Sequence, residues 1–176
     1  CVVDSFSTDA TESIVRGLGY DFYQNPWINH ASQFNWALQN CGISSDWVMR
    51  IDADEYVEDD LRESIKRFLE SPGDNNAIYF RRKIVFLGRP IKHGFFYPGL
   101  ILRMWRTGQG FVEDRWMDEH VIVDNAIATV LKGDLTDENL NDLAWWCRKH
   151  VDYSLKEAYE VIRSQSVRGS GAEGID

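Results

Sequence analysis

The decisive stretch of this sequence reads Trp47-Val48-Met49-Arg50-Ile51-Asp52-Ala53-Asp54-Glu55. The apolar run that opens it predicts a buried strand over 47–51, and helical spacing follows it. Three carboxylates therefore fall at the carboxyl end of a strand, the edge at which open α/β sheets bind ligands. Carboxylates this close repel one another, so a site that keeps them ionised usually holds a cation. Mg²⁺ or Mn²⁺ suits such oxygen ligands.

The acidic triplet also has a purely structural interpretation. Acidic residues are common on solvated loops, and this chain carries 28 of them, with a net charge of −9. The preceding strand pattern is what favours a functional site. The negative charge and the absence of a Lys/Arg stripe argue against a nucleic-acid partner. No apolar run approaches the roughly 18 residues of a membrane span.

The order of the predicted elements indicates an α/β fold. Strand and helical patterns alternate in the first half of the chain, which is typical of a parallel sheet. Two pairs, Asp9 with Glu12 and Ser154 with Glu157, have the spacing of a capping box at a helix start. The predicted strands are 1–3, 47–51, 77–86, 100–106 and 121–123, and the predicted helices are about 9–19, 31–41, 61–69, 140–147 and one starting at residue 154.

The three cysteines, Cys1, Cys41 and Cys147, lie far apart and form no CxxC pair. This spacing argues against a zinc site and against a disulfide framework, and favours free thiols in a reducing cytoplasm. Cys41 and Cys147 lie on apolar helical faces, so both are expected in the core.

Other acidic and basic residues also suggest a site. Asp4 ends the first predicted strand, where a carboxylate can accept hydrogen bonds from a base N–H or a ribose hydroxyl. Asp9 is better explained as a helix cap. Asp118 and Glu119 form a second acidic cluster that could supply a general base, although an exposed acidic loop is the structural alternative. One of the two arginines Arg103 and Arg106 could meet a phosphate, and ordinary ion pairing with an acid is at least as good an explanation.

Taken together, these features resemble the family 2 glycosyltransferases of the type-A fold, and among them the bacterial enzymes of lipopolysaccharide-core and exopolysaccharide synthesis. The resemblance implies a single Rossmann-like domain over 1–135, with a mixed, mostly parallel central sheet flanked by helices. A nucleotide-sugar half would occupy about 1–57 and an acceptor half about 75–135. A helical extension with a flexible tail would occupy 136–176. The matching stretches are 2–11, 34–38, 46–55, 97–99, 103–106, 117–120 and 145–154.

The family fold begins with a strand and a helix that have no counterpart in this sequence. We therefore expect a central strand and part of the nucleotide pocket to be missing. A segment that lacks them could be inactive on its own.

The resemblance also implies roles for individual residues. Asp4 corresponds to the aspartate that reads the nucleotide base, and Ser5 and Asp9 belong to the same nucleotide-binding motif. Asp52 and Asp54 correspond to the pair that binds the metal and the diphosphate. Asp54 is the expected direct ligand of Mn²⁺ or Mg²⁺.

The implied reaction is the metal-dependent, inverting transfer of a sugar from a nucleotide-sugar to a hydroxyl of a glycan or glycolipid acceptor. Asp118 and Glu119 stand where the family has its catalytic base, and Glu119 is preferred because an acid recurs there before a hydrophobic strand. The enzyme is expected in the cytoplasm, with peripheral association at the inner membrane left open. A nucleotidyltransferase and a non-catalytic carbohydrate-binding or scaffold module are the alternatives.

Overall fold

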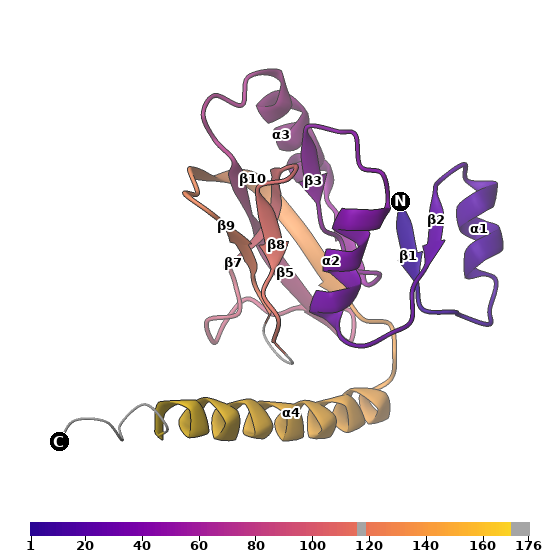
Figure 1. The fold of residues 1–176 in the computed structure, drawn as a ribbon, viewed down its shortest axis with the longest axis vertical. Coiled ribbons are helices and arrows are strands. Elements are labelled where there is room, and N and C mark those ends of the chain that lie inside the picture. The colour runs from indigo at the N-terminus through magenta and orange to yellow at the C-terminus, as the bar shows by residue number, and fades with distance from the viewer. Residues whose placement is uncertain (116–118, 170–176) are drawn as a thin grey trace. The chain divides into compact units, whose positions relative to one another are not determined.

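The structure is a computed structural model that describes residues 1–115 and 119–169 (Figure 1). The chain divides into two compact units. The first unit contains Cys1–Ser44, Phe111–His120 and the chain from Val151 onward, and the second contains Ser45–Gly110 and Val121–His150. The predicted domain boundary at residue 135, and the predicted halves within 1–135, stay predictions.

The first unit starts with a small β–α–β arrangement in which β1 and β2 run parallel. The pattern of the sequence did not predict β2, because Phe22-Tyr23-Gln24 lies between polar residues and is not part of a continuous apolar run. A capping box closes the start of α2, where the Asn29 side chain accepts a hydrogen bond from the Ser32 backbone N at 2.7 Å. In chain order the elements are β1 (Val2–Asp4), α1 (Thr11–Gly17), β2 (Phe22–Gln24) and α2 (His30–Asn40).

The start of α1 lacks the predicted capping box. Ala10 occupies the N-cap position, and the Asp9 carboxylate instead accepts from the backbone N and the hydroxyl of Thr11, at 3.0 and 2.5 Å. Glu12, the predicted partner of Asp9, pairs with Arg16 at 2.9 Å. The capping box fails because a basic residue at i+4 competes for the Glu12 carboxylate.

The second unit contains a mixed six-stranded sheet with the order β3-β7-β5-β10-β4, and β6 pairs with β5. The predicted α/β fold with a mixed central sheet and flanking helices is confirmed. The expected predominance of parallel pairs is wrong, since β5 and β10 form the one parallel pair described in this sheet. The described residues between β5 and β7 contain no helix, and without a helical crossover the chain returns antiparallel.

Three elements of this sheet were not predicted, β4, β6 and β10. β10 is interrupted by a glycine and carries charged residues, so it lacks a clean strand alternation. From β3 to β10 the elements are, in chain order, β3 (Trp47–Met49), β4 (Glu55–Val57), α3 (Asp59–Glu70), β5 (Ala77–Phe86), β6 (Arg89–Pro90), β7 (Gly99–Arg106), β8 (Gly110–Val112), β9 (Val121–Val123) and β10 (Ala128–Glu138).

The hydrophobic core of the second unit lies between α3 and the sheet. Leu61 of α3 is fully buried and belongs to one cluster with Ile78 and Phe80 of β5, Met104 of β7 and Leu135 of β10. Complete burial of such side chains stabilises a fold by about 1.5–3 kcal/mol each. This cluster therefore ties α3 to the three central strands.

Gly133 allows β10 to pass close to the start of α3. The pairing of β10 with β5 shifts register between Val130 and Asp134, and Gly133, within this interruption, has a φ of +98°. A Cβ atom at Gly133 would lie 2.2 Å from the backbone N of Leu61. Only glycine satisfies both the backbone angle and the close approach.

The C-terminal helix α4 (Leu143–Gly169) is continuous. The predicted helix start at Ser154 is therefore wrong, and the Ser154 hydroxyl donates to the Val151 carbonyl at 2.7 Å instead of capping an N-terminus. None of the described helices combines the length and the apolar character that a membrane crossing needs.

The cysteines are free thiols, as predicted, but only one of the two expected core positions is buried. Cys41 is buried and Cys147 is exposed. In the first turns of α4 the Trp146 ring packs edge-on against Phe86, with 5.2 Å between ring centroids. Cys147 is one residue further along, about 100° around the helix, so its side chain is directed away from this contact.

Candidate functional site

The predicted acidic site is a tight turn between two strands of the second unit. β3 ends at Met49, and β4 begins at Glu55, so a strand rather than a helix follows the acidic stretch. The Glu55 backbone N donates to the Asp52 carbonyl at 3.0 Å. In return, the Asp52 backbone N donates to the Glu55 carboxylate at 3.0 Å. The turn is thus closed by one backbone and one side-chain hydrogen bond.

Two buried arginines hold the carboxylate of Asp52. Its two oxygens pair with Arg50 Nε at 3.0 Å and with Arg103 Nη2 at 2.9 Å. The arginine side chains are only 7% and 10% exposed, whereas the Asp52 side chain is 38% exposed. Of the two alternatives for Arg103, phosphate contact or ion pairing, the structure has the ion pair.

The electrostatics of this cluster differ between its two carboxylates. Burial alone would raise the pKa of Asp52, but the guanidinium groups of Arg103 and Arg50 outweigh it and hold that pKa below its usual value. Burial dominates at Glu55 and raises its pKa, although Arg103 Nη2 lies 2.5 Å from the Glu55 carboxylate. Asp52 is therefore kept ionised at a partly exposed position, whereas Glu55 is sealed inside.

Asp54 projects from the same turn into a different environment. Its Oδ2 accepts a hydrogen bond from the Asn139 side-chain amide at 3.2 Å, and its backbone carbonyl accepts from Glu138 N at 2.9 Å. Asn139 follows β10, a strand that was not predicted, so no sequence signal pointed to it. Across the described residues, no group of three or more His, Cys, Asp or Glu side chains is arranged to hold a metal ion.

The predicted nucleotide-binding residues lie in the first unit, at the end of β1. Asp4 is buried, and its two oxygens accept from the Ser7 backbone N at 2.8 Å and the Ser7 hydroxyl at 2.5 Å. The hydrogen bond from the Ser7 hydroxyl is the main reason that the pKa of Asp4 is lowered. Ser5 is exposed and accepts from the Gln33 amide at 3.2 Å. Asp9 is exposed, and its contacts with Thr11 lower its pKa.

The predicted catalytic base lies on a loop of the first unit that Glu113 closes. Glu113 N donates to the His120 carbonyl at 3.0 Å, and the Glu113 carboxylate accepts from the His120 backbone N at 3.0 Å. His120 Nδ1 lies 2.7 Å from the same carboxylate. Burial would raise the pKa of Glu113, but the contacts with His120 lower it overall. Glu119 is half-buried within this loop, and Asp118 lies outside the described residues.

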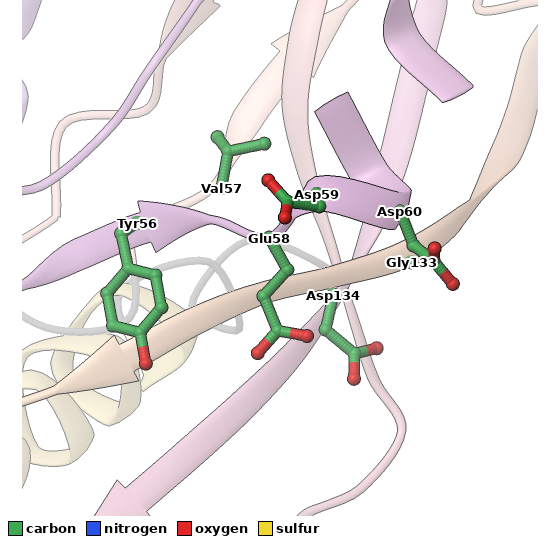
Figure 2. A pocket seen from close by; sticks show the side chains of 7 residues that line it. All are labelled: Tyr56, Val57, Glu58, Asp59, Asp60, Gly133 and Asp134. Atoms are coloured by element: carbon green, nitrogen blue, oxygen red, sulfur yellow. The ribbon is translucent and has the colours of Figure 1, made fainter. Parts of the chain in front are cut away.

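A pocket of about 540 Å³ opens on the second unit, and its lining does not include the predicted site residues. Figure 2 shows the carboxylates of Glu58 and Asp134 pointing to the same side of it. Lys83 pairs with Glu58, and the Tyr97 hydroxyl donates to Asp134 at 3.1 Å. An acid-lined pocket repels anions, so it does not suit a nucleotide diphosphate. Its lining residues are Tyr56, Val57, Glu58, Asp59, Asp60, Gly133 and Asp134.

The predicted site residues therefore fall into three groups, and the local geometry of each group is defined. Asp52 and Asp54 share one turn in the second unit, with Glu55 and Arg103 behind it. Asp4 and Glu119 belong to the first unit. The sequence did not point to Asn139 or Glu113. Asn139 contacts Asp54 and Glu113 contacts His120, and these contacts form only when the chain folds.

Comparison with known proteins identifies the family. The model of the family described as "Glycosyl transferase family 2" matches residues 1–131. An uncharacterized glycosyltransferase of Rickettsia bellii is 32% identical over 88 residues, which cover 50% of this chain and 29% of the relative. One from Rickettsia conorii is 33% identical over 88 residues, covering 50% of this chain and 30% of the relative.

A third relative has a more specific name. The lipopolysaccharide core biosynthesis glycosyltransferase LpsC of Rhizobium meliloti is 38% identical over 114 residues, covering 62% of this chain and 42% of LpsC. The chain thus spans less than half the length of these relatives. Because the family model matches most of its residues, the chain belongs to glycosyl transferase family 2.

Proposed function

We propose that this chain forms part of an enzyme that transfers a sugar from a nucleotide-sugar to a hydroxyl of a glycan or glycolipid acceptor. Family membership supports the reaction class, and similarity to LpsC supports a role in bacterial lipopolysaccharide or cell-surface polysaccharide synthesis. The observation that carries the proposal is the turn after β3. It presents Asp52, kept ionised by buried guanidinium groups, next to Asp54.

We propose Asp54 as the residue that would hold Mn²⁺ or Mg²⁺. Its carboxylate supplies the hard oxygen donors that these ions prefer, and it contacts the neutral amide of Asn139. Asp52 is the weaker candidate for direct metal contact, because both of its oxygens face guanidinium groups. Mg²⁺ sites are often completed by substrate phosphates and water. When bound, the metal supplies Lewis-acid stabilisation of the leaving diphosphate.

The proposed chemistry is an inverting displacement with Glu119 as the general base. Glu119 takes the proton of the acceptor hydroxyl, the acceptor oxygen forms a bond to the anomeric carbon, and the bond from that carbon to the diphosphate oxygen breaks. Asp4 accepts a hydrogen bond from the nucleotide base. The free thiols fit a reducing cytoplasm as the compartment.

The function is tested by incubating the protein with Mn²⁺ and a panel of uridine, guanosine, adenosine and cytidine nucleotide-sugars. Release of the free sugar with a nucleoside phosphate would support a transferase. Release of pyrophosphate from a nucleoside triphosphate and a sugar phosphate would instead indicate a nucleotidyltransferase. Failure to bind any nucleotide in the presence of metal would favour a carbohydrate-binding or scaffold module.

The metal role of Asp54 predicts a specific loss. Asp54→Asn should weaken the Mn²⁺-dependent binding of a nucleoside diphosphate at least about 100-fold, because removing even an outer-shell partner of a metal costs roughly 10- to 100-fold. The thermal midpoint should hardly change, since Asp54 is only half-buried. Isothermal titration calorimetry with and without Mn²⁺ measures this loss. Asp60→Asn is the matched control, because Asp60 is an exposed acid that lines the 540 Å³ pocket of the same unit. Equal affinities for both variants would refute the metal role.

The role of Asp4 predicts a loss with a different signature. Asp4→Ala should weaken the binding of a nucleoside and of its diphosphate by the same factor, roughly 5- to 150-fold, the usual cost of an unsatisfied buried partner. Equilibrium dialysis with both ligands measures the two factors. Asp21→Ala is the control and should leave both affinities unchanged, because Asp21 is an exposed acid of the same unit that belongs to no predicted site. A loss confined to the diphosphate would place Asp4 at the phosphates instead of the base.

A further inference from the structure

We propose that Glu55 and Arg103 form a buried positioning pair that holds the 52–55 turn in the shape needed by the donor. The inference rests on the proposed function, because it concerns the turn that carries Asp52 and Asp54. Neither Glu55 nor Arg103 would touch the ligand. Their contribution would be to fix the direction in which the two aspartates point.

The geometry of Glu55 indicates a positioning role and not a ligand role. Its side chain is only 1% exposed, so it cannot reach a metal ion or a diphosphate in solvent. One of its oxygens accepts from the Asp52 backbone N at 3.0 Å, and the other lies 2.5 Å from Arg103 Nη2. The third carboxylate of the acidic stretch thus faces inward and holds the first.

Arg103 connects this turn to the interior of the sheet. It lies on β7, whose neighbours are β3 and β5, and its carbonyl accepts from Arg50 N at 2.8 Å. Its Nη2 atom contacts both the Asp52 carboxylate and the Glu55 carboxylate. A single nitrogen therefore bridges the partly exposed end of the turn and its buried end.

The energetics of the pair do not favour a purely stabilising role. Two charges buried together cost desolvation energy that their attraction often fails to offset, and an apolar pair of similar size is commonly as stable or more so. Within the described residues Arg103 Nε is buried without a hydrogen-bond partner, which adds to the cost. A costly arrangement at a candidate ligand site is what a positioning role predicts.

The charges of the cluster also assign different parts to the two aspartates. Two guanidinium groups, of Arg50 and Arg103, face the two carboxylates of Asp52 and Glu55. Asp54, by contrast, contacts the neutral amide of Asn139. Loss of the pair would therefore disturb both the direction and the local field of the turn.

The experiment compares Glu55→Gln, Arg103→Met and Arg103→Lys with a matched control, Arg82→Met. Arg82 lies on β5 and pairs with Asp137, so the control also removes an arginine–carboxylate pair from this sheet. The first readout is the hydrogen-exchange rate of the backbone amides of Asp52 and Glu55, measured by NMR. The second is the affinity for uridine, guanosine, adenosine and cytidine diphosphates with Mn²⁺.

The expected result is a selective loosening of the turn. Glu55→Gln and Arg103→Met should speed exchange of the turn amides at least about tenfold, as expected when a charge-assisted hydrogen bond is lost. Amides of β5 should keep their protection. The same variants should weaken diphosphate binding in proportion, and Arg103→Lys should retain more of both properties than Arg103→Met. Arg82→Met should change neither the turn amides nor the affinity.

Two results would overturn the inference. If the turn amides stay protected in Glu55→Gln, the pair does not hold the turn, whatever the protein binds, and this conservative variant decides the question even if Arg103→Met fails to fold. If the turn loosens while diphosphate affinity is unchanged, the turn is not positioned for the donor. If the unaltered protein binds none of the diphosphates, the proposed function fails, and the donor role of the pair fails with it.

Discussion

Replacing Glu119 with glutamine should lower the turnover of sugar transfer by roughly 10²- to 10⁴-fold, the range for a positioned general base. Donor affinity should hardly change, because the proton moves only in the chemical step. Glu119 is half-buried in a loop whose ends are joined through Glu113 and His120. A side-chain amide at this position would have nearly the same shape as the carboxylate but could not accept the proton. Single-turnover kinetics with saturating donor measure the effect.

Asp118→Asn is the paired control for Glu119→Gln. Asp118 is the neighbouring acid, and we expect its replacement to leave most of the turnover intact. If Asp118→Asn abolishes turnover while Glu119→Gln does not, the roles of the two acids are reversed. If neither change matters, the cluster is a solvated loop and another group takes the proton.

The largest expected effect on stability is that of Gly133→Ala. A residue with a side chain at positive φ costs about 1–2 kcal/mol, and overpacking adds typically about 1–3 kcal/mol. Here the added Cβ would lie 2.2 Å from the backbone N of Leu61, and a backbone atom cannot rotate away. We therefore expect the free energy of unfolding to fall by about 2–5 kcal/mol. Urea denaturation followed by circular dichroism measures it.

Gly88→Ala is the matched control for Gly133→Ala. Gly88 lies in the same unit, between β5 and β6, and its φ of +73° is also positive, but no atom lies within 4 Å of a Cβ placed there. Its replacement should cost only the backbone term, about 1–2 kcal/mol. A similar loss for both variants would mean that strain at positive φ, and not the approach of β10 to α3, explains the requirement for glycine.

The α/β class and the main elements could be predicted from local patterns. The strands at 77–86 and 100–106 and the helix at 61–69 were recognised because each is long enough to show its own periodicity. The short strands β2 and β4 were missed because they lack the continuous apolar run that identified β1 and β9, which are equally short. β10 was missed because Gly133 and its charged neighbours break the alternation that identifies a strand.

The direction of the strands depended on information that local patterns do not contain. Alternation of strand and helix in the first half of the chain predicted a parallel sheet, but β2, the parallel partner of β1, was not among the predicted strands, and β3 pairs antiparallel with β7. In the second half the chain returns from β5 to β7 without a helix, and the pairing is antiparallel. Direction is set by the connection between two strands, whereas periodicity reports only on one strand at a time.

The sequence by itself determined the family and the chemical character of the candidate site, because Asp4, Asp52, Asp54 and Glu119 are recognised by residue type, order and position at strand ends. Only the tertiary structure decided which groups surround them. It paired Arg103 of β7 with the turn, placed Asn139 beside Asp54 and turned Glu55 inward. Arg103 and Asn139 lie far along the chain from the turn, and Glu55 faces inward because the turn is closed against β7. Strand order and burial decide these contacts, and local sequence does not encode them.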